Sequence, residues 1–70
     1  MEEGLTQKQA DVYNAIVKFN IEKNYPPTIQ EICSMINKST GSVQNCLKIL
    51  KRKKFIEWEP GKARTLKIAK

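Results

Sequence analysis

The chain has 70 residues, enough for one small domain over residues 1–70 but too few for a large catalytic cleft. Its formal net charge of +6 is unevenly placed, because residues 1–35 carry three lysines against five acidic residues and residues 36–70 carry ten lysines and arginines against two. A basic half indicates either a polyanionic partner or a solubilising surface, and the lack of a long apolar run or signal peptide indicates a soluble cytoplasmic protein.

A first helix is predicted from about residue 6 to residue 23. Thr6 and Gln9 have the spacing of a capping box, in which each side chain bonds a free backbone N–H group of the other residue. Apolar residues then recur at helical spacing and give one face to bury: Ala10, Val12, Tyr13, Ile16, Val17 and Ile21. Pro26 and Pro27 end this helix, because a residue before proline is disfavoured in helical conformation.

A second helix is predicted over residues 28–36. Thr28 and Glu31 form another capping box at its start. The apolar residues of its inner face again follow helical spacing: Ile29, Ile32, Cys33 and Ile36.

A tight turn leads into a third helix that runs to about residue 53. Asn37 tolerates a left-handed backbone, and Ser39 offers a capping oxygen, with Thr40 as the alternative start. Gly41 weakens the helix, although a small residue there permits close approach to another backbone. The inner face is again apolar: Val43, Cys46, Leu47 and Leu50. The second and third helices together have the pattern of a helix-turn-helix.

After the basic run the period of the apolar residues changes from about 3.6 to two. Residues 55–59 and 64–68 are predicted strands joined by a hairpin loop at 60–63, with these apolar residues on one face: Ile56, Trp58, Leu66 and Ile68. Trp58 is interpreted as a core residue rather than a stacking platform for bases. Three helices followed by a hairpin predict a mainly α (α+β) fold, the winged helix-turn-helix.

In a helix-turn-helix the start of the second helix faces the base edges of DNA. The polar residues on the outer face there are the base-facing candidates: Ser39, Thr40, Ser42, Gln44 and Asn45. Gln and Asn side chains can bond adenine bidentately, and Ser or Thr can bond several bases. The alternative is that Ser39 and Thr40 only cap the helix and that the others are ordinary surface.

Basic and polar residues around this helix are the candidates for phosphate contacts: Thr28, Lys38, Lys48, Lys53, Lys62 and Arg64. The alternative for the run at residues 51–54 is that its cations offset the helix macrodipole. For Lys62 and Arg64, beside the loop tip, the alternative is a charged edge that blocks strand pairing between molecules.

No catalytic set can be assembled from this sequence. Histidine and a Gly-rich phosphate loop are absent, and the acidic residues are scattered. Cys33 and Cys46 are too few ligands for a structural zinc and are interpreted as small buried hydrophobes without a disulfide. We therefore expect no enzyme activity, cofactor, metal or small-molecule substrate.

Several strings in the chain match one known family. They are Leu5-Thr6-x-x-Gln9, Tyr25-Pro26-Pro27-Thr28 with Glu31-Ile32, Leu47-Lys48-x-Leu50 with Arg52-Lys53, and Ile56-Glu57 followed by Gly61 and Arg64. On these residues the chain resembles the N-terminal DNA-binding domain of LexA, the repressor of the bacterial SOS response, over nearly its whole length. The resemblance implies sequence-specific operator binding with the third helix in the major groove.

The chain departs from the LexA pattern in four respects, the first of which is a turn before Ser39 that is one residue shorter than in LexA. Thr40, Gly41, Ser42, Gln44 and Asn45 are not the usual set, so the operator sequence is not carried over. Lys54 and Phe55 stand where the family usually has Gly and a smaller apolar residue. The self-cleavage site and the Ser/Lys dyad of the family's C-terminal domain, which is also the usual dimerisation domain, have no counterpart in these 70 residues.

The sequence therefore predicts a double-stranded DNA-binding regulator, associated with the nucleoid, with a recognition helix at 39–53 and a wing at 59–65 on the backbone or minor groove. A single module of this size binds weakly, so we expect a homodimer on a pseudo-palindrome or a protein partner. Two alternatives remain. One is a module that docks on another regulator or on RNA polymerase, and the other is a nonspecific architectural DNA binder.

Overall fold

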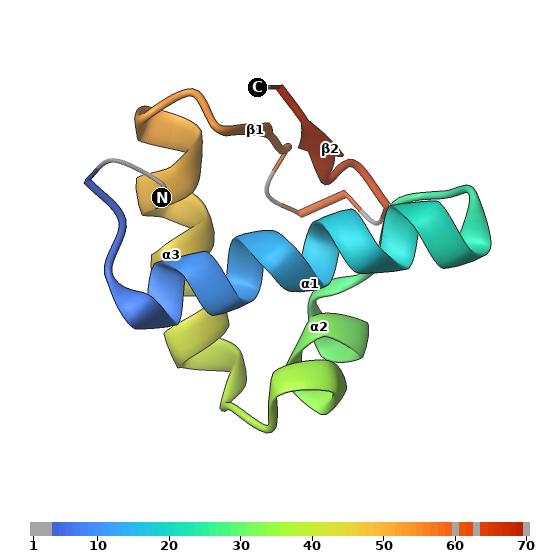
Figure 1. Cartoon of the computed structure of the whole chain (residues 1–70), viewed down its shortest axis with the longest axis horizontal. Coiled ribbons are helices and arrows are strands. Elements are labelled where there is room, and N and C mark those ends of the chain that lie inside the picture. The colour runs from blue at the N-terminus through green and yellow to red at the C-terminus, as the bar shows by residue number, and fades with distance from the viewer. Residues whose placement is uncertain (1–3, 60, 63, 70) are drawn as a thin grey trace.

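The computed structural model describes residues 4–59, 61–62 and 64–69. Within them lie α1 (Gln7–Lys23), α2 (Ile29–Ile36) and α3 (Thr40–Arg52), followed by β1 (Ile56–Glu57) and β2 (Lys67–Ile68) (Figure 1). This order confirms the predicted winged helix-turn-helix. No helix in the described part of the chain is long and apolar enough to cross a membrane.

The helices begin at the capping residues that the sequence predicts. The hydroxyl of Thr6 accepts from the N–H of Gln9 at 3.2 Å, and the Gln9 side chain accepts from the N–H of Thr6 at 3.1 Å. Thr28 and Glu31 repeat this box at α2, with distances of 3.2 and 2.7 Å. Ser39 caps α3 by accepting from the amide three residues later at 3.3 Å. Each cap satisfies N–H groups that a helix start leaves without partners.

Two asparagines end the first two helices. Asn24 and Asn37 are both left-handed, with φ of 63° and 58°, a conformation that Asn tolerates better than most residues. Beyond Asn37 the N–H of Lys38 donates to the Cys33 carbonyl at 3.2 Å, which closes the end of α2. The predicted turn between α2 and α3 is therefore confirmed.

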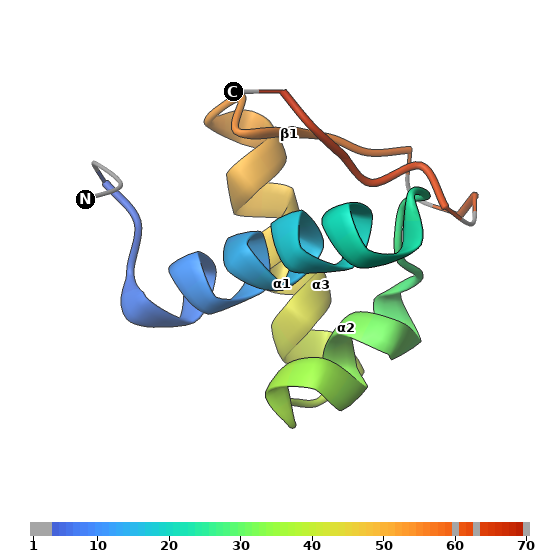
Figure 2. The same ribbon diagram turned by 45° about the vertical axis from the view of Figure 1, so that its right-hand side comes forward.

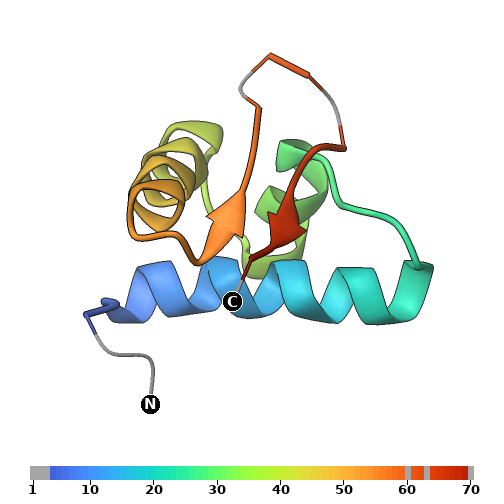
Figure 3. The ribbon, with the colours of Figure 1, turned by 90° about the horizontal axis from the view of Figure 1, so that it is seen from above.

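The core lies where the three helices and the hairpin meet. α1 crosses the middle of the molecule with α2 on one side and the strands on the other, while α3 packs against all three (Figures 1 and 2). Seen from above, the strands lie over α1 and beside α3 (Figure 3). Buried residues from every element but β2 fill the centre, including Val12, Ile16, Ile32, Val43, Leu47, Leu50 and Ile56.

The strands are shorter than predicted, and the connection between them is longer. Only two residue pairs align, Ile56 with Ile68 and Glu57 with Lys67, so the predicted strands at 55–59 and 64–68 and the loop at 60–63 are wrong in extent. We call the connection at residues 58–66 the wing. Two residues of the predicted loop, Pro60 and Ala63, lie outside the described residues.

Two residues of the wing account for the early end of the strand pairing. The Thr65 hydroxyl accepts from the N–H of Glu59 at 2.9 Å and lies 3.2 Å from its carbonyl, so a side chain takes the place of a strand-to-strand bond. Arg64 has a left-handed backbone with φ of 60°, which a strand does not accommodate.

Candidate nucleic-acid interface

The outer face of α3 presents four of the predicted base-facing and phosphate-contacting residues together. Gln44, Asn45 and Lys48 are exposed and Ser42 is half-buried, whereas the residues of the opposite face are buried. A hollow of about 340 Å³ lies on this face and is lined by all four. We call Ser42, Gln44, Asn45 and Lys48 the recognition face. Their contact with DNA stays a prediction.

Ser39 and Thr40, the other two base-facing candidates, lie at the start of α3. The Ser39 hydroxyl serves as the helix cap, which is the alternative that the sequence left open. The Thr40 hydroxyl accepts a weak bond from the Cys33 thiol at 3.8 Å, and both residues are exposed. Neither hydroxyl lines the hollow beside the recognition face.

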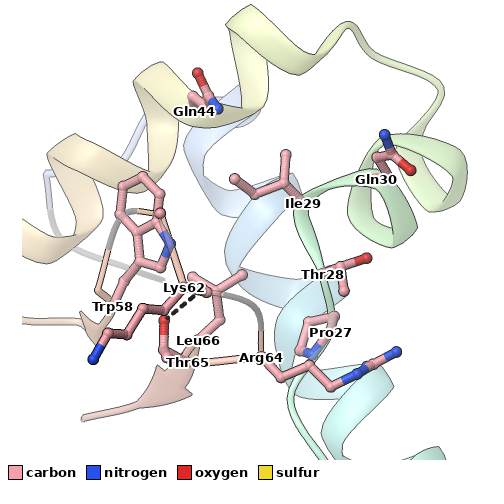
Figure 4. Close-up of a pocket in the computed structure, with 11 residues that line it drawn as sticks. Pro27, Thr28, Ile29, Gln30, Gln44, Trp58, Lys62, Arg64, Thr65 and Leu66 are labelled. Atoms are coloured by element: carbon pink, nitrogen blue, oxygen red, sulfur yellow. Dashed lines mark hydrogen bonds between the residues drawn. The ribbon is translucent and has the colours of Figure 1, made fainter.

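A second hollow, also of about 340 Å³, separates the helix-turn-helix from the wing (Figure 4). Polar side chains come from three elements: Gln30 from α2, Gln44 from α3 and Lys62 from the wing (Figure 4). Trp58 and Leu66 lie below these polar side chains (Figure 4). Trp58 is only 6% exposed, which confirms the interpretation of Trp58 as a core residue. The helix-turn-helix and the wing thus border one polar-edged groove.

The phosphate candidates differ in how free their side chains are. Lys38 and Lys48 are exposed, and neither forms a salt bridge with any described residue. Lys62 lies 3.5 Å from Glu59, but both side chains are largely exposed, at 73% and 66%, so this pair is weak and easily exchanged. The Lys53 ammonium donates to the Gly4 carbonyl.

Arg64 has several partners in the structure. Its guanidinium donates to both carboxylate oxygens of Glu31 at 3.2 Å and to the Pro26 carbonyl at 2.9 Å. It also lies over the ring of Tyr25, 4.7 Å from the centroid. The Thr28 amide and the Arg64 guanidinium hold the pKa of Glu31 below its usual range, because both stabilise the carboxylate.

Sequence analysis did not identify Lys8 as a site residue. Lys8 is exposed near the start of α1 and lines the hollow beside the recognition face, together with Asn45 and Lys48. Its position in the sequence marks it only as part of the solvent face of α1. The packing of α1 against α3 brings it to the site, so no local pattern could have indicated it.

Both cysteines are free thiols. Cys46 is buried, and this burial raises the pKa of its thiol, while Cys33 is half-buried. Among the described residues, no three His, Cys, Asp or Glu side chains are grouped so that they could hold a metal ion.

A helix-turn-helix with a polar outer face on its second helix, bordered by a basic wing, defines a winged helix-turn-helix DNA-binding domain. The sequence profile of the LexA DNA-binding domain matches residues 2–65, so the chain belongs to this family.

Curated relatives agree with this assignment. A LexA repressor from Clostridium perfringens (strain 13 / Type A) is 41% identical over 64 residues, which are 90% of this chain and 32% of the relative. LexA repressors from Clostridium kluyveri (strain NBRC 12016) and Caldicellulosiruptor saccharolyticus are 36% and 39% identical over 69 residues, 97% of this chain and 34% of each relative. The chain thus spans about a third of the length of these relatives.

Proposed function

We propose that this domain binds double-stranded DNA in a sequence-specific manner and represses transcription at an operator. α3 enters the major groove, where Gln44 and Asn45 bond base edges and Ser42 supports them. The observation that carries this proposal is the exposure of the recognition face around one hollow, in a chain of the LexA family. Amide side chains on such a helix suit adenine, which offers one acceptor and one donor in the major groove.

Lysines around the recognition face supply the phosphate contacts. Lys48 and Lys8 lie at the same hollow, Lys38 lies in the turn, and Lys62 lies across the groove on the wing. Thr28, at the start of α2, lines the groove as well and is retained as a phosphate contact. Lys53 is exposed at the end of α3 and remains a candidate as well, because its bond to the Gly4 carbonyl uses only one of the three donors of the ammonium.

One such domain on one half-site buries only about 600–1,000 Å² and binds weakly. We therefore propose that operator binding involves either a second copy on a pseudo-palindrome or a protein partner. The working location of the domain is the nucleoid, in the cytoplasm.

The test is a binding titration against duplexes selected from a random library and against scrambled duplexes, at several salt concentrations. Wild-type protein should prefer the selected duplex, and its affinity should fall steeply with salt. The Gln44→Ala/Asn45→Ala variant should lose the preference while retaining salt-dependent binding. Asn14→Ala, an exposed amide on α1 away from the recognition face, is the matched control and should keep the preference.

Two other results would overturn the proposal. Salt-dependent binding without sequence preference in the wild type would indicate an architectural DNA binder. Negligible affinity for every duplex at low salt would indicate a protein-interaction module.

A further inference from the structure

The contacts of Arg64 join two segments that are far apart in the sequence. From the wing, its guanidinium reaches Tyr25, Pro26 and Glu31 at the start of α2. We call these three residues the arginine socket. All three belong to the Tyr-Pro-Pro-Thr-x-x-Glu string at residues 25–31, which runs from the turn after α1 into the first turn of α2.

The socket is built to hold a guanidinium rather than any cation. The two parallel bonds to Glu31 form the bidentate geometry that distinguishes an effective ion pair from a loose one. A carbonyl and an aromatic face take up further sides of the planar group. The Tyr25 ring is itself supported, because it packs edge-on against Phe19 with centroids 5.5 Å apart.

Glu31 serves the wing and the helix at the same time. One of its oxygens accepts from the N–H of Thr28 at 2.7 Å and also from Arg64 at 3.2 Å. The start of α2 and the wing therefore share a carboxylate. A movement of the wing relative to α2 would break the pair, so the contact fixes one segment against the other.

Trp58 and Leu66 hold the two ends of the wing in the core, so the part whose position remains to be fixed is the tip around Gly61 and Lys62. The ladder at its base has only two residue pairs, and the bonds of Thr65 to Glu59 and Lys62 lie within the wing itself. The left-handed backbone at Arg64, with φ of 60°, is unfavourable for a residue with a Cβ. The contacts that the Arg64 side chain makes in the arginine socket offset this cost.

We propose that Arg64 is a positioning residue, which by docking in the arginine socket sets the wing and its Lys62 against α2 and α3 and so raises DNA affinity without contacting DNA. This inference rests on the proposed function. It replaces the predicted phosphate contact of Arg64, because the groups that would bind a phosphate already bind Glu31 and Pro26.

The decisive variant is Glu31→Gln. Glutamine retains the helix cap, as Gln9 does at α1, but removes the charge that holds Arg64. If Arg64 positions the wing, affinity for the selected duplex should fall about 2- to 5-fold, as expected for loss of a partly exposed charged contact. If Arg64 instead contacts a phosphate, the variant frees it and removes a nearby negative charge, so affinity should rise.

Two further variants separate geometry from charge. Arg64→Lys keeps the positive charge but loses the bidentate pair, so it should bind as weakly as Arg64→Ala. Combining Glu31→Gln with Arg64→Ala should cost no more than either change alone, because both break one contact. Glu59→Gln is the matched control, since it removes a carboxylate from the wing but leaves the socket intact, and its affinity should be unchanged or higher.

A measurement without DNA completes the test. Backbone amide relaxation of the free protein should show ordered amides at Gly61, Lys62 and Thr65 in the wild type. In Glu31→Gln and Arg64→Ala their order parameters should fall below about 0.6, while α3 stays rigid.

An unchanged wing in both variants would overturn the inference, and so would a rise of affinity in Glu31→Gln or recovery of affinity in Arg64→Lys. If the wild type bound no duplex at all, the proposed function would fail, whereas the relaxation data would still decide whether Arg64 orders the wing.

Discussion

Lys8 of α1 and Lys48 of α3 line the same hollow beside the recognition face, although they lie far apart in the sequence. Both lysines thus border the surface where the proposed function places a DNA backbone. Substitutions at these lysines and at neighbouring residues should therefore change DNA binding or stability through charge, steric contact or backbone conformation.

Lys8→Ala and Lys48→Ala should each weaken binding to selected and scrambled duplexes alike. Loss of one phosphate contact should reduce the slope of log affinity against log salt by about 0.9. Lys18→Ala, on a different part of α1, should leave the slope unchanged. An unchanged slope in Lys8→Ala would show that α1 does not contact the backbone.

Gly41→Ala should change stability and binding in opposite directions. Gly41 lies in α3 without positive φ, and a Cβ built there meets nothing within 4 Å, so alanine should stabilise the domain by about 0.5–1 kcal/mol. Because Gly41 also lines the hollow beside the recognition face, the added methyl group should weaken duplex binding if the DNA backbone approaches closely there. Thermal unfolding and duplex titration measure the two effects, and unchanged affinity would place the backbone elsewhere.

Lys54→Gly should raise the stability of the domain. Lys54 is left-handed, with φ of 67°, at the position where the LexA family usually has glycine, and lysine is strained in this conformation by about 1 kcal/mol. The melting temperature should therefore rise by about 4–8 °C. Lys51→Gly, within the last turn of α3, is the control and should lower it. A lower melting temperature in Lys54→Gly would mean that the lysine side chain contributes more than its backbone costs.

The ion pair of Glu31 and Arg64 should make stability depend on pH. Because the pKa of Glu31 is lowered in the folded state, its contribution is complete above the usual carboxyl range, near pH 4, and is lost as the pH falls through the lowered value. At pH 7 the wild type should thus be more stable than Glu31→Gln, and the difference should shrink toward pH 2. Both side chains are partly exposed, Glu31 at 35% and Arg64 at 41%, so added salt should reduce the difference as well. Urea unfolding at several pH values tests this, and a constant difference would contradict it.

The sequence by itself determined the order of elements and the ends of the helices. Capping boxes such as Thr28 with Glu31, and a left-handed Asn37, act over three or four residues, so their spacing in the sequence is sufficient to predict them. The helical period likewise placed the recognition face outward, because burial of one stripe leaves the opposite side exposed.

Only the tertiary structure decided how the parts combine. The alternation of apolar and polar residues predicted longer strands. In the structure the bonds of Thr65 to Glu59 and the left-handed backbone of Arg64 end the ladder after two residue pairs. The sequence shows that Arg64 is charged. Its pairing with Glu31 depends on the fold, which brings the wing to the start of α2. Lys8 reaches the recognition face for the same reason, since local spacing carries no information on contacts between elements far apart in the chain.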